Sequence, residues 1–532
     1  MAKFNQAGTR PAVGTGPIVT ESQPTGTTYE GAAGYARDAK SELFLLAVSN
    51  MVGEASFYES AGDRDDRYAK LVHKVAVEDA GWTLGFLRWL RAEGNMRSAS
   101  LVGAAEAVKA RLDAARAGRE VANGARNRQL IDVVLQRADE PGEMLAYWTS
   151  RYGRAIPKPV KRGITDAVRR MYTERALLKY DTASHGFRFG DVIELVHPAP
   201  DSGKPWQGAL FAHALDRRHN RPWAVDPDML PMLAFNATLR AAAAERPERL
   251  LDPEALRRAG MTWEDVLSLV GSRVDKARLW EALIPSMGYM ALLRNLRNFD
   301  QAGVSDEIAG QVAARLADPE QVARSRQFPF RFLAAYRNVP SLRWGYALET
   351  ALQHSLAAVP ELPGRTLILV DRSGSMFTSM SRRSELTFAD SAGIFGAALA
   401  VRNHGRVTLV QFGTSSQEIR VGRGESLLRV LGRFDNLGGT QTAEAVRAHY
   451  DRHDRVIIVT DEQVWYGHGD PGDHVPAHVP LYTFNLVGYE RGHQAGGPNR
   501  VTIGGGLTDH AFRLIPLLEA GRNGVWPWET RG

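Results

Sequence analysis

The feature that most constrains this sequence is a change in the spacing of its apolar residues near residues 360–364. Before it, from Ser41 to about His354, apolar side chains recur every three or four residues, as in SELFLLAVSNMV, WTLGFLRWLRA and YMALLRNLRNF. This is the period of a helix with one apolar face. Short breaks carrying Gly, Pro or Asn separate these segments and have lengths that join antiparallel helices. The first part of the chain is therefore predicted to be an irregular, HEAT-like array of helix pairs.

After residues 360–364, short apolar runs alternate with helical stretches. RTLILVD, RVTLVQFG, RVIIVTDE and VPLYTFNLVG have the length of buried strands, and segments such as FADSAGIFGAALAVRN and TAEAVRAHY lie between them. This alternation predicts a mainly parallel sheet covered by helices on both faces. In such sheets the ligand site lies at the carboxyl ends of the strands. The predicted fold class is an α-helical repeat array followed by a doubly wound, Rossmann-like α/β domain.

The expected domain limits follow this change in the spacing of apolar residues. A chain of 532 residues exceeds what one hydrophobic core supports. We expect a flexible arm rich in Gly, Pro, Thr and Ser over residues 1–29, a helical domain over 30–358 and an α/β domain over 362–532. The sequence shows neither a signal-peptide pattern nor an apolar run long enough to span a membrane, and it has no cysteine. A soluble, cytoplasmic protein without disulfides or zinc–thiolate sites is the expectation.

Oxygen-bearing side chains gather where the predicted strands of the second part end. Asp371 ends the first strand, and the turn after it carries Ser373 and Ser375 in a DxSxS pattern; the loop GGTQT offers Thr440, and Asp461 ends the strand RVIIVTD. Carboxylate and hydroxyl oxygens are the ligands that Mg²⁺ prefers. We expect these five residues to bind a divalent cation, Mg²⁺ first, with Mn²⁺ or Ca²⁺ as alternatives. The other interpretation is a helix cap, because Asp and Ser also cap helices well.

These five residues resemble the metal-ion-dependent adhesion site (MIDAS) of von Willebrand A domains at every position. The resemblance implies a site that captures a partner whose acidic side chain completes the metal's coordination. Neither a second metal nor a positioned base accompanies the motif, as a metal-dependent nuclease or phosphatase would require. The protein is therefore predicted not to be an enzyme.

The most basic stretch of the chain runs over residues 151–180 in the helical part. Val160, Ile164, Val168 and Met171 have the spacing of an inward-facing stripe. This leaves six cations to face outward or toward an edge: Lys158, Lys161, Arg162, Arg169, Arg170 and Arg175. Cations interleaved with Tyr152, Tyr172 and Tyr180 suit a phosphate backbone with stacked bases. A solvated cationic helix is the alternative interpretation.

The helical part resembles the TROVE module of the Ro autoantigen and its bacterial relatives. The segments KPVKRGITDAVRRMYTERALLKYD, FGDVIELVHPAP, IPSMGYMALLRNLRNF and FPFRFLAAY carry this resemblance, and so does the order of a TROVE module before a von Willebrand A domain. It implies RNA contacts at Lys179 and His197, and the most characteristic helix includes Arg294 and Asn295. After Lys179 the sequence departs from the family, reading Asp181 to His185 where a second basic residue is common. His197 could instead pack at a helix end, and Arg294 and Asn295 could tie helices together.

The resemblance also implies a function. A ring of helical repeats, its ends joined by the C-terminal domain, would bind a small Y-like noncoding RNA outside and the 3′ ends of structured or misfolded RNAs in its hole. Such a ribonucleoprotein would act in RNA quality control or processing, without a membrane and with a 3′ exonuclease such as polynucleotide phosphorylase as one expected partner. The alternative function is a metal-dependent protein-interaction scaffold without a specific RNA ligand.

Overall fold

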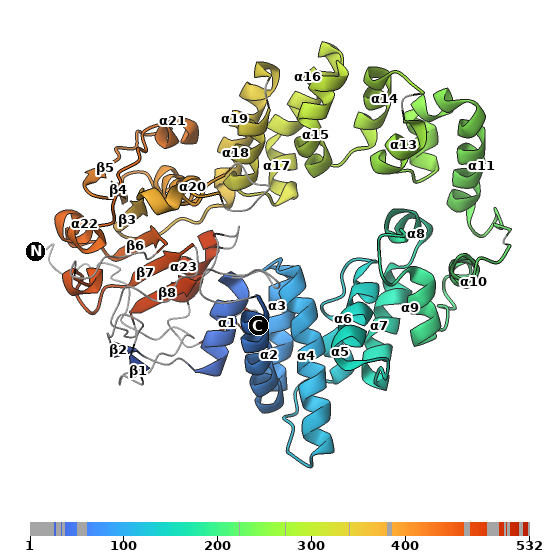
Figure 1. Ribbon diagram of the computed structural model, residues 1–532, viewed down its shortest axis with the longest axis horizontal. Coiled ribbons are helices and arrows are strands. Elements are labelled where there is room, and N and C mark those ends of the chain that lie inside the picture. The colour runs from blue at the N-terminus through green and yellow to red at the C-terminus, as the bar shows by residue number, and fades with distance from the viewer. Residues whose placement is uncertain are drawn as a thin grey trace, which may run out of the picture. The chain divides into compact units, whose positions relative to one another are not determined.

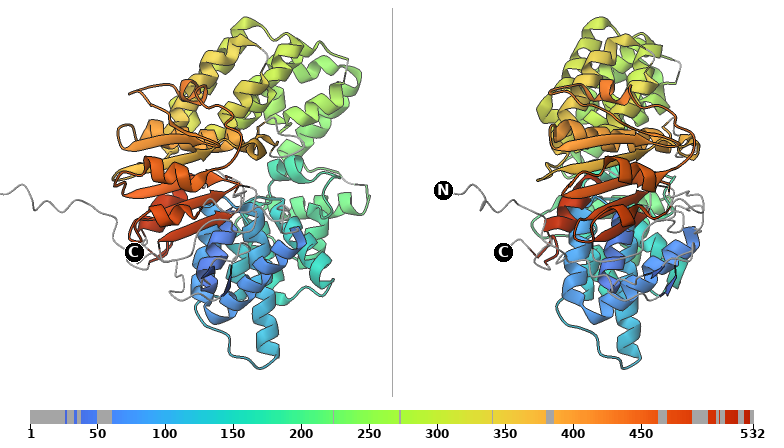
Figure 2. Two further views of the ribbon diagram at one scale, coloured as in Figure 1. Left: turned by 60° about the vertical axis from the view of Figure 1, so that its left-hand side comes forward. Right: turned by 90° about the vertical axis from the view of Figure 1, so that its left-hand side faces the viewer.

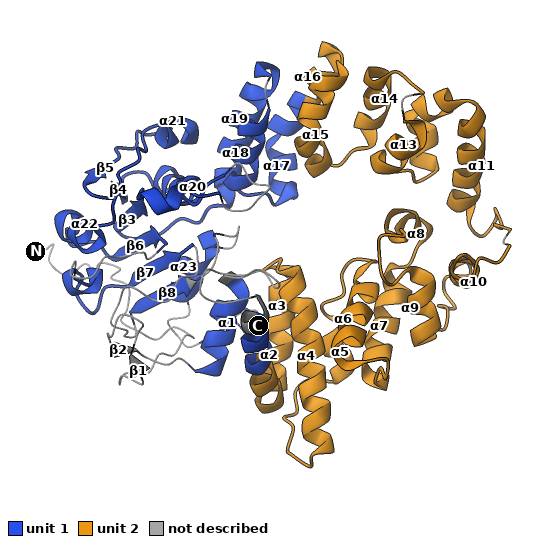
Figure 3. Cartoon of the chain, viewed as in Figure 1, with its two compact units in different colours: residues 1–71, 313–532 blue, residues 72–312 orange. Residues whose placement is uncertain are grey.

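The computed structural model describes residues 26–27, 33–34, 38–49, 61–222, 224–271, 273–339, 341–379, 386–461, 469–486, 499–504, 507, 511–520 and 525–529. The chain divides into two compact units: unit 1 combines residues 1–71 with 313–532, and unit 2 holds residues 72–312 (Figure 3). Most of the arm predicted over residues 1–29 lies outside the described residues. None of the described helices is long and apolar enough to cross a membrane.

Unit 2 is built from consecutive short helices (Figure 1). Its helices are α3 Ala80–Ala92, α4 Arg97–Arg116, α5 Asn127–Asp132, α6 Glu140–Tyr152, α7 Lys158–Met171, α8 Glu174–Tyr180, α9 Phe189–Val196, α10 Trp206–Arg218, α11 Pro231–Glu245, η1 Pro247–Leu251, α12 Pro253–Arg258, α13 Trp263–Val270, α14 Lys276–Leu283, η2 Ile284–Ser286 and α15 Tyr289–Ala302. Helix α2, Ala61–Glu78, leads into this unit, and α16, Asp306–Ala317, leads out of it.

Neighbouring helices of unit 2 pack in pairs, so the predicted helical array is confirmed. Helix α3 packs on α4, α5 on α7, and α9 on α10. The contact between α5 and α7 is close because Gly163 has no side chain: a Cβ there would lie 2.7 Å from both the carbonyl oxygen of Arg128 and the Cβ of Ile131. A larger residue at position 163 would therefore push the two helices apart.

Unit 1 contains a six-stranded sheet among its described residues. Its elements are β1 Gly26–Thr27, β2 Ala33–Gly34, α1 Ala39–Ser49, α17 Pro319–Ser325, α18 Pro329–Asn338, η3 Leu342–Trp344, α19 Gly345–Ser355, η4 Leu356–Ala358, β3 Thr366–Asp371, η5 Gly374–Phe377, α20 Phe388–Arg402, β4 Val407–Phe412, β5 Ser416–Glu418, α21 Leu427–Leu431, α22 Thr442–His449, β6 Arg455–Thr460, η6 Pro471–His474, β7 Leu481–Asn485, β8 Arg500–Gly504 and α23 Ala511–Ala520.

The strand order is β5-β4-β3-β6-β7-β8, and all pairings are parallel except that of β5, which lies antiparallel at one edge. Every residue of β3 is buried, as expected for a central strand covered on both faces. Helix α20 lies close to this strand at Gly396, where a Cβ would come within 2.6 Å of Val370. The predicted α/β fold class is confirmed.

Helices from the first part of the sequence also cover this sheet. Helix α1 packs beside β8 (Figure 1 and Figure 2). Phe44 of α1 lies 5.4 Å from Trp526, measured between ring centroids. Helix α18 packs on α20, and Phe328 stacks on Phe512 of α23. The spacing of apolar residues changes near position 360, but the core of unit 1 contains residues from before and after that position.

A buried ion pair joins β6 to α23. The guanidinium of Arg455 is fully buried and donates to Glu519 at 2.7 and 2.8 Å, and to the hydroxyl of Thr366 at 2.8 Å. Removing one partner of such a pair leaves an uncompensated buried charge, which costs about 3–5 kcal/mol.

We expect Glu519→Ala to lower the free energy of unfolding by about that amount. The control is Glu444→Ala, which removes an exposed ion pair with Arg447 and should cost no more than about 1 kcal/mol. Urea denaturation followed by circular dichroism measures both. If both variants lose the same free energy of unfolding, the buried Arg455–Glu519 pair stabilises the fold no more than an exposed pair does.

Candidate functional site

The first candidate site lies at the end of β3. The carboxylate of Asp371 is buried and accepts hydrogen bonds from the backbone N–H of Ser373 at 2.8 Å and from the hydroxyl of Thr460 at 2.5 Å. The hydroxyl oxygens of Ser373 and Ser375 lie 3.2 Å apart. One turn thus gathers a carboxylate and two hydroxyls. We call residues 371–375 the cation turn.

The other two predicted residues reach the same edge of the sheet from neighbouring segments. Gly374 donates its N–H to the carbonyl of Gly438 at 2.7 Å, which binds the loop carrying Thr440 to the cation turn. Gly438 has φ = +78°, a conformation that glycine adopts without strain. Asp461 directly follows β6, which runs parallel to β3 in a register that pairs Val370 with Val459. The structure therefore places all five predicted residues at the same edge of the sheet.

The electrostatics of this site fit a divalent cation. Burial and, second, the nearby carboxylate of Asp461 raise the pKa of Asp371 to about 7, although the hydrogen bonds from Thr460 and Ser373 act in the opposite direction. Asp461 is itself buried. Two buried carboxyl groups that disfavour each other's charge, together with hydroxyl oxygens, are a donor set that a hard cation such as Mg²⁺ satisfies.

The second candidate site is the outer face of helix α7. Val160, Ile164 and Val168 are fully buried and Met171 is half-buried, so the predicted inward stripe is confirmed. Lys158 and Arg162 are exposed and Lys161 is half-exposed. Nearby carboxylates are already engaged: Asp166 binds Arg128, and Asp132 binds Arg170. Within the described part of the chain, none of the three cations on this face has a carboxylate partner.

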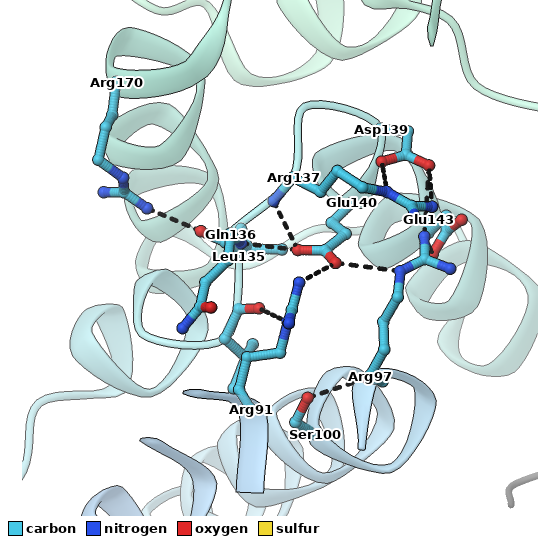
Figure 4. Close-up of polar contacts among 11 residues, drawn as sticks. Arg91, Arg97, Ser100, Leu135, Gln136, Arg137, Asp139, Glu140, Glu143 and Arg170 are labelled. Atoms are coloured by element: carbon cyan, nitrogen blue, oxygen red, sulfur yellow. Dashed lines mark hydrogen bonds and ion pairs between the residues drawn. The ribbon is translucent and has the colours of Figure 1, made fainter. Parts of the chain in front are cut away.

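The remaining predicted cations differ in what they contact. Arg170 donates to Asp132, the last residue of α5, at 2.7 Å and to the carbonyl of Leu135 at 2.8 Å, so it ties α7 to α5 and the segment after it. Figure 4 shows the bond to Leu135. Arg169 lies 3.9 Å from Asp201. Arg175 and Lys179 are exposed, and the Lys179 ammonium lies 4.9 Å from the ring centroid of the adjacent Tyr180.

Two of the three tyrosines of this stretch, Tyr152 and Tyr172, do not form the predicted stacking surface. Tyr172 is buried and stacks on Phe189 at 3.7 Å between ring centroids. Tyr152 donates its hydroxyl hydrogen bond to the buried Glu106 at 2.5 Å. The expectation that bases stack on Tyr172 is wrong because its ring belongs to the core.

Three further predicted RNA contacts lie on α9 and α15. His197 is exposed in a left-handed conformation with φ = +51° and caps α9, donating its N–H to the carbonyl of Ile193. Arg294 is exposed. Asn295 is only 4% exposed; it donates to the carbonyl of Ala291 at 2.8 Å and accepts from Asn298 at 2.7 Å. These bonds favour the alternative in which Asn295 holds its helix in place.

Sequence reasoning missed a buried carboxylate centre in unit 2. Glu140 is fully buried and accepts hydrogen bonds from Arg91 at 2.5 Å, from Arg97 at 3.0 Å and from the backbone N–H groups of Gln136 and Arg137 (Figure 4). Arginines from α3 and α4 therefore form ion pairs inside the fold. Counting all arginines in the sequence consequently overstates the positive charge that unit 2 presents to a ligand.

A second buried carboxylate, Glu106, joins α4 to α6. It accepts hydrogen bonds from Tyr147 and Tyr152, both at 2.5 Å, and lies 2.5 Å from His73 Nε2. Burial opposes its charge, but these hydrogen bonds outweigh burial and hold the pKa of Glu106 below its ordinary value. The centre explains why Tyr152 is not free to contact a ligand.

Comparison with known proteins gives three results. The family model of the TROVE domain matches residues 248–355. Telomerase protein component 1 of Mus musculus and that of Rattus norvegicus are each 45% identical to this chain over 83 residues, or 15% of the chain, which spans 3% of the length of these curated relatives. The crystal structure of the Deinococcus radiodurans Ro protein (Rsr) matches with a TM-score of 0.66 and 19% sequence identity, covering 92% of this chain and 100% of that one.

By its fold and these matches the chain is similar to Ro proteins: a helix-rich region with a TROVE-domain match precedes an α/β domain whose mainly parallel sheet is consistent with a von Willebrand A-like fold. The predicted resemblance to the TROVE and Ro proteins is confirmed.

The pKa of Asp371 generates a prediction for protein kept in EDTA. The ordinary pKa is 3.8 and the folded value is about 7, so between these values the folded state retains a proton that the unfolded chain releases. Stability therefore falls as pH rises through this window, by up to about 1.4 kcal/mol per pH unit. In urea denaturation, the free energy of unfolding of Asp371→Asn should fall less between pH 5 and 7 than that of the wild type. The free energy of unfolding of Asp451→Asn, which changes an exposed carboxylate, should fall as it does in the wild type.

Proposed function

We propose that this protein is a non-catalytic RNA-binding component of a cytoplasmic ribonucleoprotein. Its RNA ligands would be a small Y-like noncoding RNA and the 3′ ends of structured or misfolded noncoding RNAs, with a role in RNA quality control or processing. The observation that carries the proposal is a set of three cations on α7, Lys158, Lys161 and Arg162, which have no carboxylate partner among the described residues and lie opposite a buried apolar stripe. The Ro-like fold and the TROVE match support it.

Phosphates are the partner that best fits this helix. Because Asp132 and Asp166 are already bound to arginines, an RNA backbone approaching α7 would not meet free carboxylates at these two positions. Arg175 and Lys179 of α8 are exposed farther along the chain and would extend the contact. Binding through phosphates releases counterions, so affinity should fall steeply with salt.

The test is a salt titration of binding to an RNA hairpin with a single-stranded 3′ tail. The variant K158Q/K161Q/R162Q should bind more weakly and lose about two units of salt slope, since each single-strand phosphate contact contributes about 0.7. Arg170 stays unchanged in this variant because it holds α7 to its neighbours. The same hairpin without the tail should bind more weakly to the wild type.

The control variant is R249Q/K276Q/R278Q, which removes three exposed cations elsewhere in unit 2. It should keep wild-type affinity and slope. Equal losses in both variants would point to diffuse electrostatic attraction. If neither the tail nor the α7 cations matter, the protein is better described as a metal-dependent protein-interaction scaffold.

We also propose that the cation turn, with Thr440 and Asp461, binds Mg²⁺ and serves binding rather than catalysis. The support is the convergence of five oxygen donors at one sheet edge, two of them buried carboxyl groups. When bound, the cation would neutralise these carboxylates and offer an open position to an acidic protein ligand. That ligand, and a 3′ exonuclease such as polynucleotide phosphorylase, are partners that the resemblance implies.

Magnesium binding should stabilise the folded protein. At a concentration about 100-fold above the dissociation constant the gain is about 2.7 kcal/mol. Thermal unfolding with Mg²⁺ and with EDTA should show this gain in the wild type and in Asp451→Asn, but not in Asp371→Asn. A gain that persists in Asp371→Asn would place the cation elsewhere.

A further inference from the structure

The second residue of the cation turn, Arg372, makes contacts that the motif does not require. Its side chain is 7% exposed. The guanidinium donates from Nε to the carbonyl of Asp435 and from Nη1 to the carbonyl of Ala389, both at 2.8 Å. It also lies 4.7 Å from the ring centroid of Phe377 and 5.4 Å from that of Phe434. The buried guanidinium of Arg372 is thus held by two carbonyl groups and two aromatic rings.

These contacts join the segments on which the cation donors depend. Asp435 lies five residues before Thr440, and the backbone N–H of Leu437 donates to the carbonyl of Arg372 at 2.9 Å. Arg372 therefore fixes the loop that presents Thr440 through both its side chain and its main chain. The planar guanidinium suits this task because its N–H groups diverge toward two acceptors. A lysine ammonium could not reproduce that fork.

The other acceptor, Ala389, lies in the first turn of α20, beside Asp390. Asp390 closes the capping box of this helix: it accepts from the N–H of Thr387 at 2.9 Å and from its hydroxyl at 2.8 Å. It also binds Arg337 of α18 at 2.7 Å. Burial alone would raise the pKa of Asp390, but Arg337 and the capping bonds hold it below its ordinary value.

Apolar packing runs beside this polar connection. Leu333 of α18 and Ile394 of α20 belong to one buried cluster, with Phe330 and Leu431 packed against it. Helix α18 lies inside the segment that matches the TROVE domain. A shift of the first turn of α20 would therefore act on a helix of the TROVE segment through both an ion pair and a packed core.

We propose that Arg372 is a positioning residue that holds the Thr440 loop ready for the cation and, through the start of α20 and the Asp390–Arg337 pair, couples cation binding to helix α18. The inference rests on the proposed cation site. Occupation of the site would draw the cation turn and the Thr440 loop together. Because Arg372 binds the carbonyl of Ala389, the first turn of α20 and then α18 would become more rigid.

The test combines Mg²⁺ affinity with hydrogen exchange. Arg372→Lys keeps the charge but loses the fork, and should weaken Mg²⁺ binding, measured by calorimetry, by at least about ten-fold, the factor that losing one hydrogen bond to a charged group implies. In the wild type, Mg²⁺ should slow amide exchange in residues 434–441 and 329–338. Arg337→Gln should retain Mg²⁺ binding and the protection of residues 434–441 while losing that of residues 329–338.

The matched control is Arg402→Lys. Arg402 lies at the other end of α20, where it bonds the carbonyl of Val359 and the carboxylate of Glu361. This variant should bind Mg²⁺ with wild-type affinity, and Mg²⁺ should slow its amide exchange in the same residues as in the wild type. Unchanged Mg²⁺ affinity in Arg372→Lys would overturn the role of Arg372.

Two further outcomes separate this inference from the proposed function. If the wild type does not bind Mg²⁺, the cation site itself is rejected and the coupling with it. If the wild type binds Mg²⁺ but residues 329–338 exchange at the same rate with and without the cation, the site stands and the coupling fails. That comparison uses only wild-type protein, so it decides the matter even if Arg372→Lys does not fold.

Discussion

The need to cover both faces of a parallel sheet governs unit 1. Strand β3 is buried at every residue, so water is excluded from both of its faces. Helices α20 and α23 supply part of that cover, and they in turn pack against α18 through Phe328, Phe395 and Phe512. At the edge strand β8 the cover comes from α1, near the other end of the sequence. The α/β fold is therefore completed by helices that the sequence places in a different domain.

Arginine is the residue on which the interior of both units depends. Glu140 in unit 2 and Glu519 in unit 1 are each held by buried or half-buried guanidinium groups, and the guanidinium of Arg372 binds two backbone carbonyls. A guanidinium can satisfy several acceptors at once in a fixed plane, which makes it suited to joining separate backbone segments. The cations that remain outside, on α7 and α8, are the ones that carry the proposed RNA contacts. Some of the arginines thus join segments inside the fold, and others lie exposed on its surface.

Local patterns predicted the parts of this protein that are local in origin. The three- and four-residue spacing predicted the helices, the apolar runs predicted β3, β4, β6 and β7, and the order of Asp371, Ser373, Ser375, Thr440 and Asp461 along the strands predicted their convergence. The misses involve partners distant in sequence. Tyr172 stacks on Phe189, Arg170 binds Asp132 and α1 packs on β8, and no spacing within one segment reveals such a partner. Asn295 is a different case, because its amide bonds Ala291 and Asn298 of its own helix, an alternative that the sequence had left open.

The Arg455–Glu519 pair also bears on the order in which the chain matures. The two residues are 64 positions apart, and Arg455 leaves the ribosome first. Until the carboxylate follows, burying the guanidinium in β6 would carry the full cost of an unpaired charge. Burial of β6 in the sheet is therefore expected to wait until α23 has been synthesised. An ion pair that ties strand to helix in the folded molecule would thus also determine when this part of the sheet can be buried during synthesis.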